Sequence, residues 1–145
     1  MKITEGRIGN WVLVPTNTEL KIPSYPKKIK GITKFGEFDF TEPEYPKKFI
    51  EPALHCAGVP LIEQVLFKAG LKQIAVTSHD ADFGSRDHVK YYNLFDEYIL
   101  LRVYDRIHLL FDADYEMYEI RELEYIHELQ NIYHDLTKNE LKIEL

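Results

Sequence analysis

The sequence has little cysteine and no long hydrophobic run, and both shortages narrow the possible classes of protein. Of its 145 residues only Cys56 carries a thiol, so no internal disulfide can form and no oxidising compartment is implied. The most apolar stretch, 98–103, is too short to span a bilayer, and Arg102 interrupts it. The first residues show no apolar run after their positive charges, which argues against a signal peptide. We therefore expect a soluble cytoplasmic protein that does not associate with membranes.

Glycine and proline are also scarce, at 7 residues each, and this excludes a collagen-like chain. Aromatic residues make up 13% of the chain and apolar residues 45%, which excludes wholesale disorder and a simple coiled coil. A globular chain of this length removes about two-thirds of its unfolded surface from water, so it can build a core without disulfides or metals.

Charge is distributed unevenly between the two ends of the chain. Residues 1–54 carry 9 Lys/Arg and 7 Asp/Glu, a net +2, whereas residues 55–145 carry 9 and 17, a net −8. An acidic surface repels phosphate backbones, so the C-terminal part is not expected to bind nucleic acid. The change in charge favours a small β unit over 1–54 and an α+β core over 55–145, although one continuous domain would also accommodate it.

The N-terminal part shows β patterning. We expect a first strand over 8–14, a proline-containing loop over 15–28, and a strand over 37–41 that follows Gly36. Together these segments predict a small, barrel-like antiparallel unit.

The C-terminal part combines two helical patterns with a run of strands. Pro60 and Gly70 bracket the first helix, and the second spans 123–137. Between them, 72–77 is expected to form a short strand. Four β-rich runs, at 89–93, 98–104, 107–111 and 115–120, predict an antiparallel meander with tight turns at 105–106 and 112–114. Both faces of 98–104 are bulky, so this strand should be central. A short last strand over 141–145 completes an α+β fold with two helices packed on one side of the sheet.

Three segments in this order resemble a known family. They are Arg7-Ile8-Gly9-Asn10-Trp11-Val12, then Val59-Pro60-Leu61-Ile62-Glu63 through Lys68-Ala69-Gly70, and then 125–133 with Leu136-Thr137 and Glu140-Leu141. They resemble RIGNWV, IPLTEEILLKAGF and YVHQLQNLYFALTGEEL motifs in small uncharacterised proteins of phages, prophages and mobile elements, chiefly of the Bacteroidetes lineage. The family has Thr at the place of Ile62 and usually Gly at the place of Lys138 or Asn139. The resemblance implies a phage-type accessory protein and implies no activity.

A polar loop at 78–88 is the first candidate site. Its His79, Asp80, Asp82 and His88 supply the imidazole and carboxylate donors that zinc, manganese or iron ions take. Their spacing matches no known metal signature, and Asp and Ser also favour turns. The loop leaves open a metal-dependent hydrolase as an alternative function.

Two smaller candidates contain histidine. His127, Asn131 and His134 fall on one stripe of the second helix, where hydrogen bonds to neighbouring backbone are the simpler explanation. Cys56 follows His55, but no local signature marks it as a nucleophile, and a free cysteine is usually a small buried hydrophobe.

The remaining candidates point to binding. Tyrosine offers a large contact area at little entropic cost, and the binding residues that we select on this basis in the C-terminal part are Tyr91, Tyr98 and Tyr104. A mildly basic patch near the N-terminus contains Lys27, Lys28, Lys47 and Lys48.

The sequence favours a protein that binds another macromolecule, most simply a protein, through an acidic, tyrosine-rich sheet face and without catalysis. No cofactor is expected. An oligomeric structural component, formed by pairing of an exposed sheet edge, is a further alternative.

Overall fold

The structure is a computed structural model that describes residues 1–15, 23–44, 47–75, 89–114 and 116–145. It divides into two compact units. Unit 1 consists of Met1–Pro60 and Tyr125–Ile132, and unit 2 consists of Leu61–Glu124 and Tyr133–Leu145. The expected boundary between residues 54 and 55 lies six residues before the chain first passes from unit 1 to unit 2. The sequence did not predict that residues 125–132 belong to unit 1.

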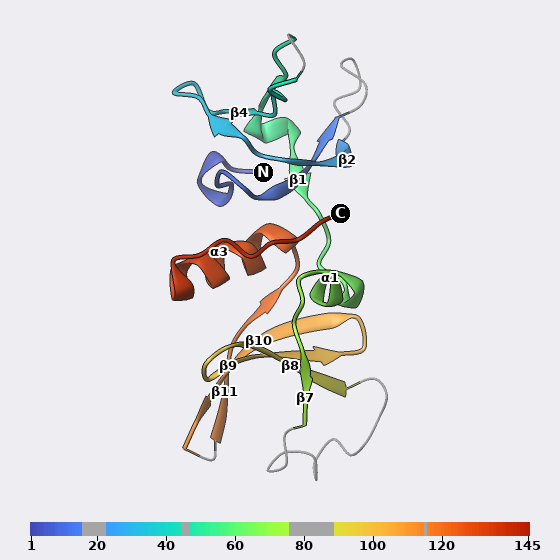
Figure 1. Cartoon of the computed structure of the whole chain (residues 1–145), viewed down its shortest axis with the longest axis vertical. Helices are drawn as coiled ribbons and strands as arrows, with labels where there is room; N and C mark the ends of the chain where they lie inside the picture. The colour runs from blue at the N-terminus through green and yellow to red at the C-terminus, as the bar shows by residue number, and fades with distance from the viewer. Residues whose placement is uncertain (16–22, 45–46, 76–88, 115) are drawn as a thin grey trace. The chain divides into compact units, whose positions relative to one another are not determined.

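Unit 1 is built from two small antiparallel sheets (Figure 1). One sheet has the order β2 (Pro23–Lys28), β1 (Trp11–Pro15) and β6 (Ala57–Gly58). The other has the order β3 (Gly31–Ile32), β4 (Glu37–Asp39) and β5 (Ile50–Pro52). Two short 3-10 helices, at Ile3–Glu5 and Ala53–His55, complete the unit. Its core consists of Val12, Val14, Ile29, Phe38, Phe40, Ala53 and Cys56.

Strand β2 contradicts the loop predicted over 15–28. Pro23 and Pro26 both lie in this strand, and Pro26 is opposite Leu13 of β1. Proline lacks a backbone N–H, which confines it to edge strands, and β2 is an outer strand of its sheet. The prolines are therefore typical of an edge strand.

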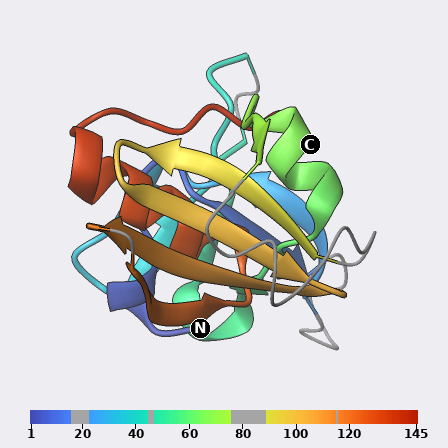
Figure 2. The same ribbon diagram turned by 90° about the horizontal axis from the view of Figure 1, so that it is seen from below.

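Unit 2 contains a five-stranded antiparallel sheet, and the class is α+β with a meander, as predicted. The strand order is β11-β10-β9-β8-β7, and Figure 2 shows the twisted sheet from below. The strands are β7 (Gln73–Ile74), β8 (Val89–Phe95), β9 (Tyr98–Val103), β10 (Arg106–Ala113) and β11 (Glu116–Leu123). β9 is central, which confirms the inference from its two bulky faces. The turn after β9 is formed by Tyr104 and Asp105, one residue earlier than predicted.

The first helix, α1 (Glu63–Lys68), begins three residues later than predicted. Pro60 instead forms an isolated antiparallel bridge with Tyr125, so its backbone is extended rather than helical. Gly70 has a φ of 75°, the left-handed conformation that favours glycine after a helix.

The second helix, α3 (Ile126–Thr137), also starts later than predicted, because Leu123 is the last residue of β11. After α3, the described chain to Leu145 forms neither helix nor strand, so the predicted last strand is wrong. Leu141 and Ile143 are nevertheless buried. This segment therefore packs two apolar side chains without strand pairing.

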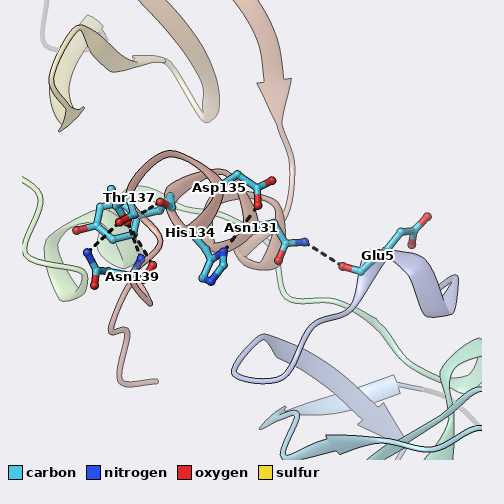
Figure 3. A network of polar contacts seen from close by, with 7 residues as sticks. Glu5, Asn131, His134, Asp135, Thr137 and Asn139 are labelled. Atoms are coloured by element: carbon cyan, nitrogen blue, oxygen red, sulfur yellow. Dashed lines mark hydrogen bonds and ion pairs between the residues drawn. The ribbon is translucent and has the colours of Figure 1, made fainter.

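Hydrogen bonds close the C-terminal end of α3 (Figure 3). The Thr137 hydroxyl donates to the Tyr133 carbonyl at 2.8 Å and accepts from the Asn139 backbone N–H at 3.0 Å. The Lys138 N–H donates to the His134 carbonyl at 2.7 Å, and Lys138 has a left-handed φ of 60°. Glycine is the usual residue in this conformation.

Candidate functional site

One end of the unit 2 sheet carries a row of four aromatic residues on one face. The strand register places Phe95 opposite Tyr98, Tyr98 opposite Phe111, and Phe111 opposite Tyr118. Directly opposite residues in antiparallel strands share a face, so these side chains form a continuous row across β8, β9, β10 and β11. The rings of Tyr98 and Phe111 lie 5.2 Å apart between centroids. We call these four residues the aromatic row.

The aromatic row is partly open to solvent. Tyr118, on the edge strand β11, is 53% exposed, and the other three rings are half-buried. The Tyr118 hydroxyl donates a hydrogen bond of 2.5 Å to Glu116, and this bond raises the pKa of the phenol. Large, stiff rings left accessible on a sheet face are typical of interaction surfaces.

Carboxylates lie beside the aromatic row along the chain. Asp96 and Glu97 form the turn between Phe95 and Tyr98, Asp114 follows β10, and Glu116 begins β11, and we call these four the acidic rim. Asp112 lies opposite Met117 and faces the other side of the sheet. Residues 95–98 and 111–118 include no Lys or Arg. The two segments that carry Tyr98, Phe111 and Tyr118 therefore combine aromatic residues with negative charge only.

A polar cluster joins α1 to the same sheet at a different place. Glu63, the first residue of α1, accepts a hydrogen bond of 2.5 Å from the Tyr92 hydroxyl and one of 3.0 Å from Lys90, and its other oxygen lies 3.5 Å from Arg102. The Tyr92 hydrogen bond lowers the pKa of Glu63 most, burial opposes it, and Lys90 and Arg102 lower it further. Burial and this hydrogen bond raise the pKa of Tyr92. The ionised carboxylate thus attaches α1 to β8 and β9.

An open cavity of about 420 Å³ lies beside this cluster. Its lining combines apolar and polar side chains and both signs of charge: Ile62, Glu63, Gln64, Arg102, Tyr104, Asp105 and Ile107. Because Glu63 is already paired with two cations, the cluster itself is explained by its role in holding α1 on the sheet.

The three tyrosines that we selected from the sequence lie in different environments. Tyr98 belongs to the aromatic row. Tyr91 is only 5% exposed and packs with Ile99 and Leu110 on the opposite face of the sheet, so it is a core residue and does not belong to an exposed surface. Tyr104 is 64% exposed, but it lies in the turn after β9, at the other end of the strand from Tyr98.

Sequence reasoning did not select Phe95, Phe111 or Tyr118 for the binding surface. The signal that could have identified them is the hairpin spacing. Two turn residues separate Phe95 from Tyr98, which makes them cross-strand partners. Predicting the first meander strand only to Asn93 left Phe95 out of the sheet.

The basic candidates lie in unit 1. The Lys27 ammonium lies 5.1 Å from the centroid of the Phe49 ring, so the structure brings β2 next to the segment that contains Lys47 and Lys48. Lys28 is also on β2, where it is half-buried opposite Trp11. Lys47 and Lys48 are exposed. The four lysines thus divide between two neighbouring segments.

The predicted metal loop lies outside the described residues, as do His79, Asp80, Asp82 and His88. Within the described ranges, no group of three His, Cys, Asp or Glu side chains is placed to hold a metal ion.

The helix stripe does not form a shared site. His127 is buried in unit 1 and stacks on the Tyr125 ring at 5.6 Å, and the Asn131 amide donates to the Glu5 carbonyl at 3.1 Å (Figure 3). His134, further along α3, lies 3.7 Å from Asp135. Asn131 therefore makes the backbone contact expected of a structural residue.

Cys56 is a buried residue of the unit 1 core. Burial, together with the nearby Glu51 carboxylate, raises the pKa of its thiol to about 12. A nucleophilic cysteine needs a lowered pKa, so the environment of Cys56 suppresses the reactive thiolate.

The opening and closing motifs of the family resemblance meet in unit 1. The Gln130 side-chain oxygen accepts from the Trp11 backbone N–H at 3.0 Å and from the Asn10 side chain at 3.5 Å, and its amide donates to the Gly9 carbonyl at 3.2 Å. Gln130 is buried, so these bonds satisfy polar atoms that would otherwise be costly. Gly9, Asn10, Trp11 and Gln130 therefore have an architectural role.

Among the described residues, no helix has the length and apolar character needed to cross a membrane. Comparison with known proteins adds no further assignment: no family model, curated protein or solved structure matches the chain.

Proposed function

We propose that this protein acts by binding another protein, rather than by catalysing a reaction, and that the aromatic row forms the centre of its binding surface. The observation that carries this proposal is the continuous row of Phe95, Tyr98, Phe111 and Tyr118 at an accessible end of the sheet. Aromatic side chains dominate the energetics of protein interfaces, because they bury a large area at a small cost in rotamer entropy.

Charge supports a protein partner over nucleic acid. The four carboxylates of the acidic rim lie beside the row along the chain, and residues 95–98 and 111–118 contribute no cation to balance them. Such a surface repels phosphate, whereas protein–protein association gains orientation and speed from complementary charge.

We further propose that the protein works in the cytoplasm as a phage-type accessory protein. Its single cysteine needs no oxidising compartment. The resemblance of the three motif segments to that family supports this proposal.

The test is differential capture with the full chain as bait. Wild type, Tyr118→Ala and Tyr104→Ala are immobilised, exposed to lysate of the source cell, and the eluates are compared by quantitative mass spectrometry. We expect a partner that wild type and Tyr104→Ala retain and that Tyr118→Ala loses by tenfold or more. The purified partner should then bind wild type stoichiometrically in calorimetry. A partner held equally by all three chains, or no stoichiometric partner, would contradict the proposal.

A further inference from the structure

The aromatic row and the acidic rim together define the chemistry of the segment that they would receive. We infer that the partner contacts this surface through an extended segment rich in arginine, whose guanidinium groups lie on the rings and pair with the rim carboxylates. This inference rests on the proposed function and adds the chemical class of the partner to it.

The first step of the argument is the arrangement of the rings. Neighbouring strands are about 4.8 Å apart, so a row across four strands spans about 14 Å. An extended segment advances about 3.3 Å per residue, so roughly five residues cross the row. Successive side chains on one face of that segment are about 6.6 Å apart, which allows two or three of them to meet the rings. The inferred motif therefore has cations at alternate positions.

The second step is the combination of ring and carboxylate. The Tyr118 hydroxyl donates to Glu116 at 2.5 Å, so an exposed ring and an anion are held side by side. A guanidinium group stacks on an aromatic face and still directs its N–H donors sideways to a carboxylate. Lysine offers a compact, more strongly hydrated charge and cannot do both equally well. This geometry favours arginine over lysine.

The third step excludes the other occupants of this face. A second copy of the chain, docked by the same surface, would bring one acidic rim against another, and like charges in contact oppose association. The bases of a nucleic acid strand could stack on the rings, but its phosphates would meet the four carboxylates of the acidic rim. Charge complementarity thus selects a cationic peptide segment.

The experiment measures fluorescence anisotropy of three labelled nine-residue peptides with the full-length protein. In these peptides Arg, Lys or Glu alternates with Ser, so length and spacing are identical. We expect the Arg peptide to bind most tightly, the Lys peptide at least threefold more weakly, and the Glu peptide not at all. Raising NaCl from 50 to 300 mM should weaken binding of the Arg peptide at least fivefold.

Matched variants locate the binding. Tyr118→Ala should weaken binding of the Arg peptide by tenfold or more. Tyr118→Phe keeps the ring and should weaken binding less than threefold. Glu116→Gln should weaken it more than Glu140→Gln, which removes an exposed carboxylate outside the rim. Tyr104 is an exposed tyrosine at the other end of β9, so Tyr104→Ala should leave binding unchanged. Thermal melts of every variant exclude loss of folding as the cause.

Several outcomes would overturn the inference. They are equal binding of the Arg and Glu peptides, equal losses with Tyr118→Ala and Tyr104→Ala, or a dimer in light scattering that Tyr118→Ala dissociates. Its failure is distinguishable from failure of the proposed function. If the captured partner depends on Tyr118 but the Arg peptide does not displace it, the binding function stands and the arginine motif is wrong.

Discussion

At the scale of single residues, Glu63 shows how one side chain can depend on several donors. It is the first residue of α1, and its partners Lys90, Tyr92 and Arg102 lie on β8 and β9. Hydrogen bonds to a charged group contribute about 1.5–3 kcal/mol, more than those between neutral groups. Much of the attachment of α1 to the sheet therefore depends on the charge of Glu63.

The lowered pKa of Glu63 makes this attachment sensitive to acid. The unfolded chain takes up the proton near the ordinary value of 4.5, and the folded chain does so only at lower pH. The stabilisation is therefore complete above pH 4.5 and is lost as pH falls through the folded pKa. We expect the melting temperature of wild type to fall more steeply than that of Glu63→Gln between pH 5 and pH 3. Parallel curves in differential scanning calorimetry would contradict this prediction.

Cys56 should be chemically silent in the folded protein. It lies in the unit 1 core, and its pKa is raised to about 12, so almost no thiolate is present at pH 8. We expect iodoacetamide at pH 8 to leave Cys56 unmodified in the native state and to alkylate it completely in urea. Intact-mass spectrometry over time measures both. Native labelling at the rate of a free thiol would show that the core around Cys56 is open.

The neighbouring tyrosines of β8 show what the sequence alone could not decide. Successive strand residues point to opposite faces, so the side chains of Tyr91 and Tyr92 lie on opposite faces of the sheet. Both faces are buried near these two residues. Alternation identifies exposed positions only where one face meets solvent. For this reason the α+β class and the central strand β9 were predictable, whereas the choice of Tyr91 for an exposed surface was not.

At the scale of secondary structure elements, the residue that follows α3 has an unfavourable backbone conformation. Lys138 has a left-handed φ of 60°, where a side chain costs about 1 kcal/mol and glycine costs little. The family motif that this segment resembles usually carries glycine at this place or the next. Sequence reasoning noticed the departure but had no backbone angle with which to explain it.

Replacing this residue should therefore stabilise the protein. We expect Lys138→Gly to raise the free energy of unfolding by about 0.5–1 kcal/mol, because it relieves the strained backbone. Urea denaturation followed by circular dichroism provides the measurement. The matched change Asn139→Gly should lower stability, since the Asn139 side-chain amide donates a hydrogen bond to the Thr137 carbonyl and φ at Asn139 is not positive. The reverse order of the two variants would rule out strain at Lys138.

At the scale of the whole molecule, chain order and structural units do not coincide. Tyr125–Ile132 belong to unit 1, although more than sixty residues separate them from Pro60 along the chain. Gln130 accounts for part of this return, because its buried side chain makes hydrogen bonds to Gly9, Asn10 and Trp11. Composition changes along the sequence reveal a boundary, but they carry no information about such a return.

This arrangement predicts that residues 1–60 do not fold alone. Without Gln130, Gly9, Asn10 and Trp11 lose their hydrogen bonds to its side chain, and the bridge between Pro60 and Tyr125 is absent. Because that bridge brings these two positions together, a short glycine-rich turn can join 1–60 directly to 125–137. We expect the joined chain to melt cooperatively and fragment 1–60 to show no cooperative transition. Gln130→Ala should lower the melting temperature of the joined chain, and the surface change Glu44→Gln, at an exposed position, should lower it less. The contrary result is a cooperative melt of fragment 1–60 alone at the temperature of the joined chain. It would show that the first sixty residues form an independent domain and that residues 125–137 do not contribute to its stability.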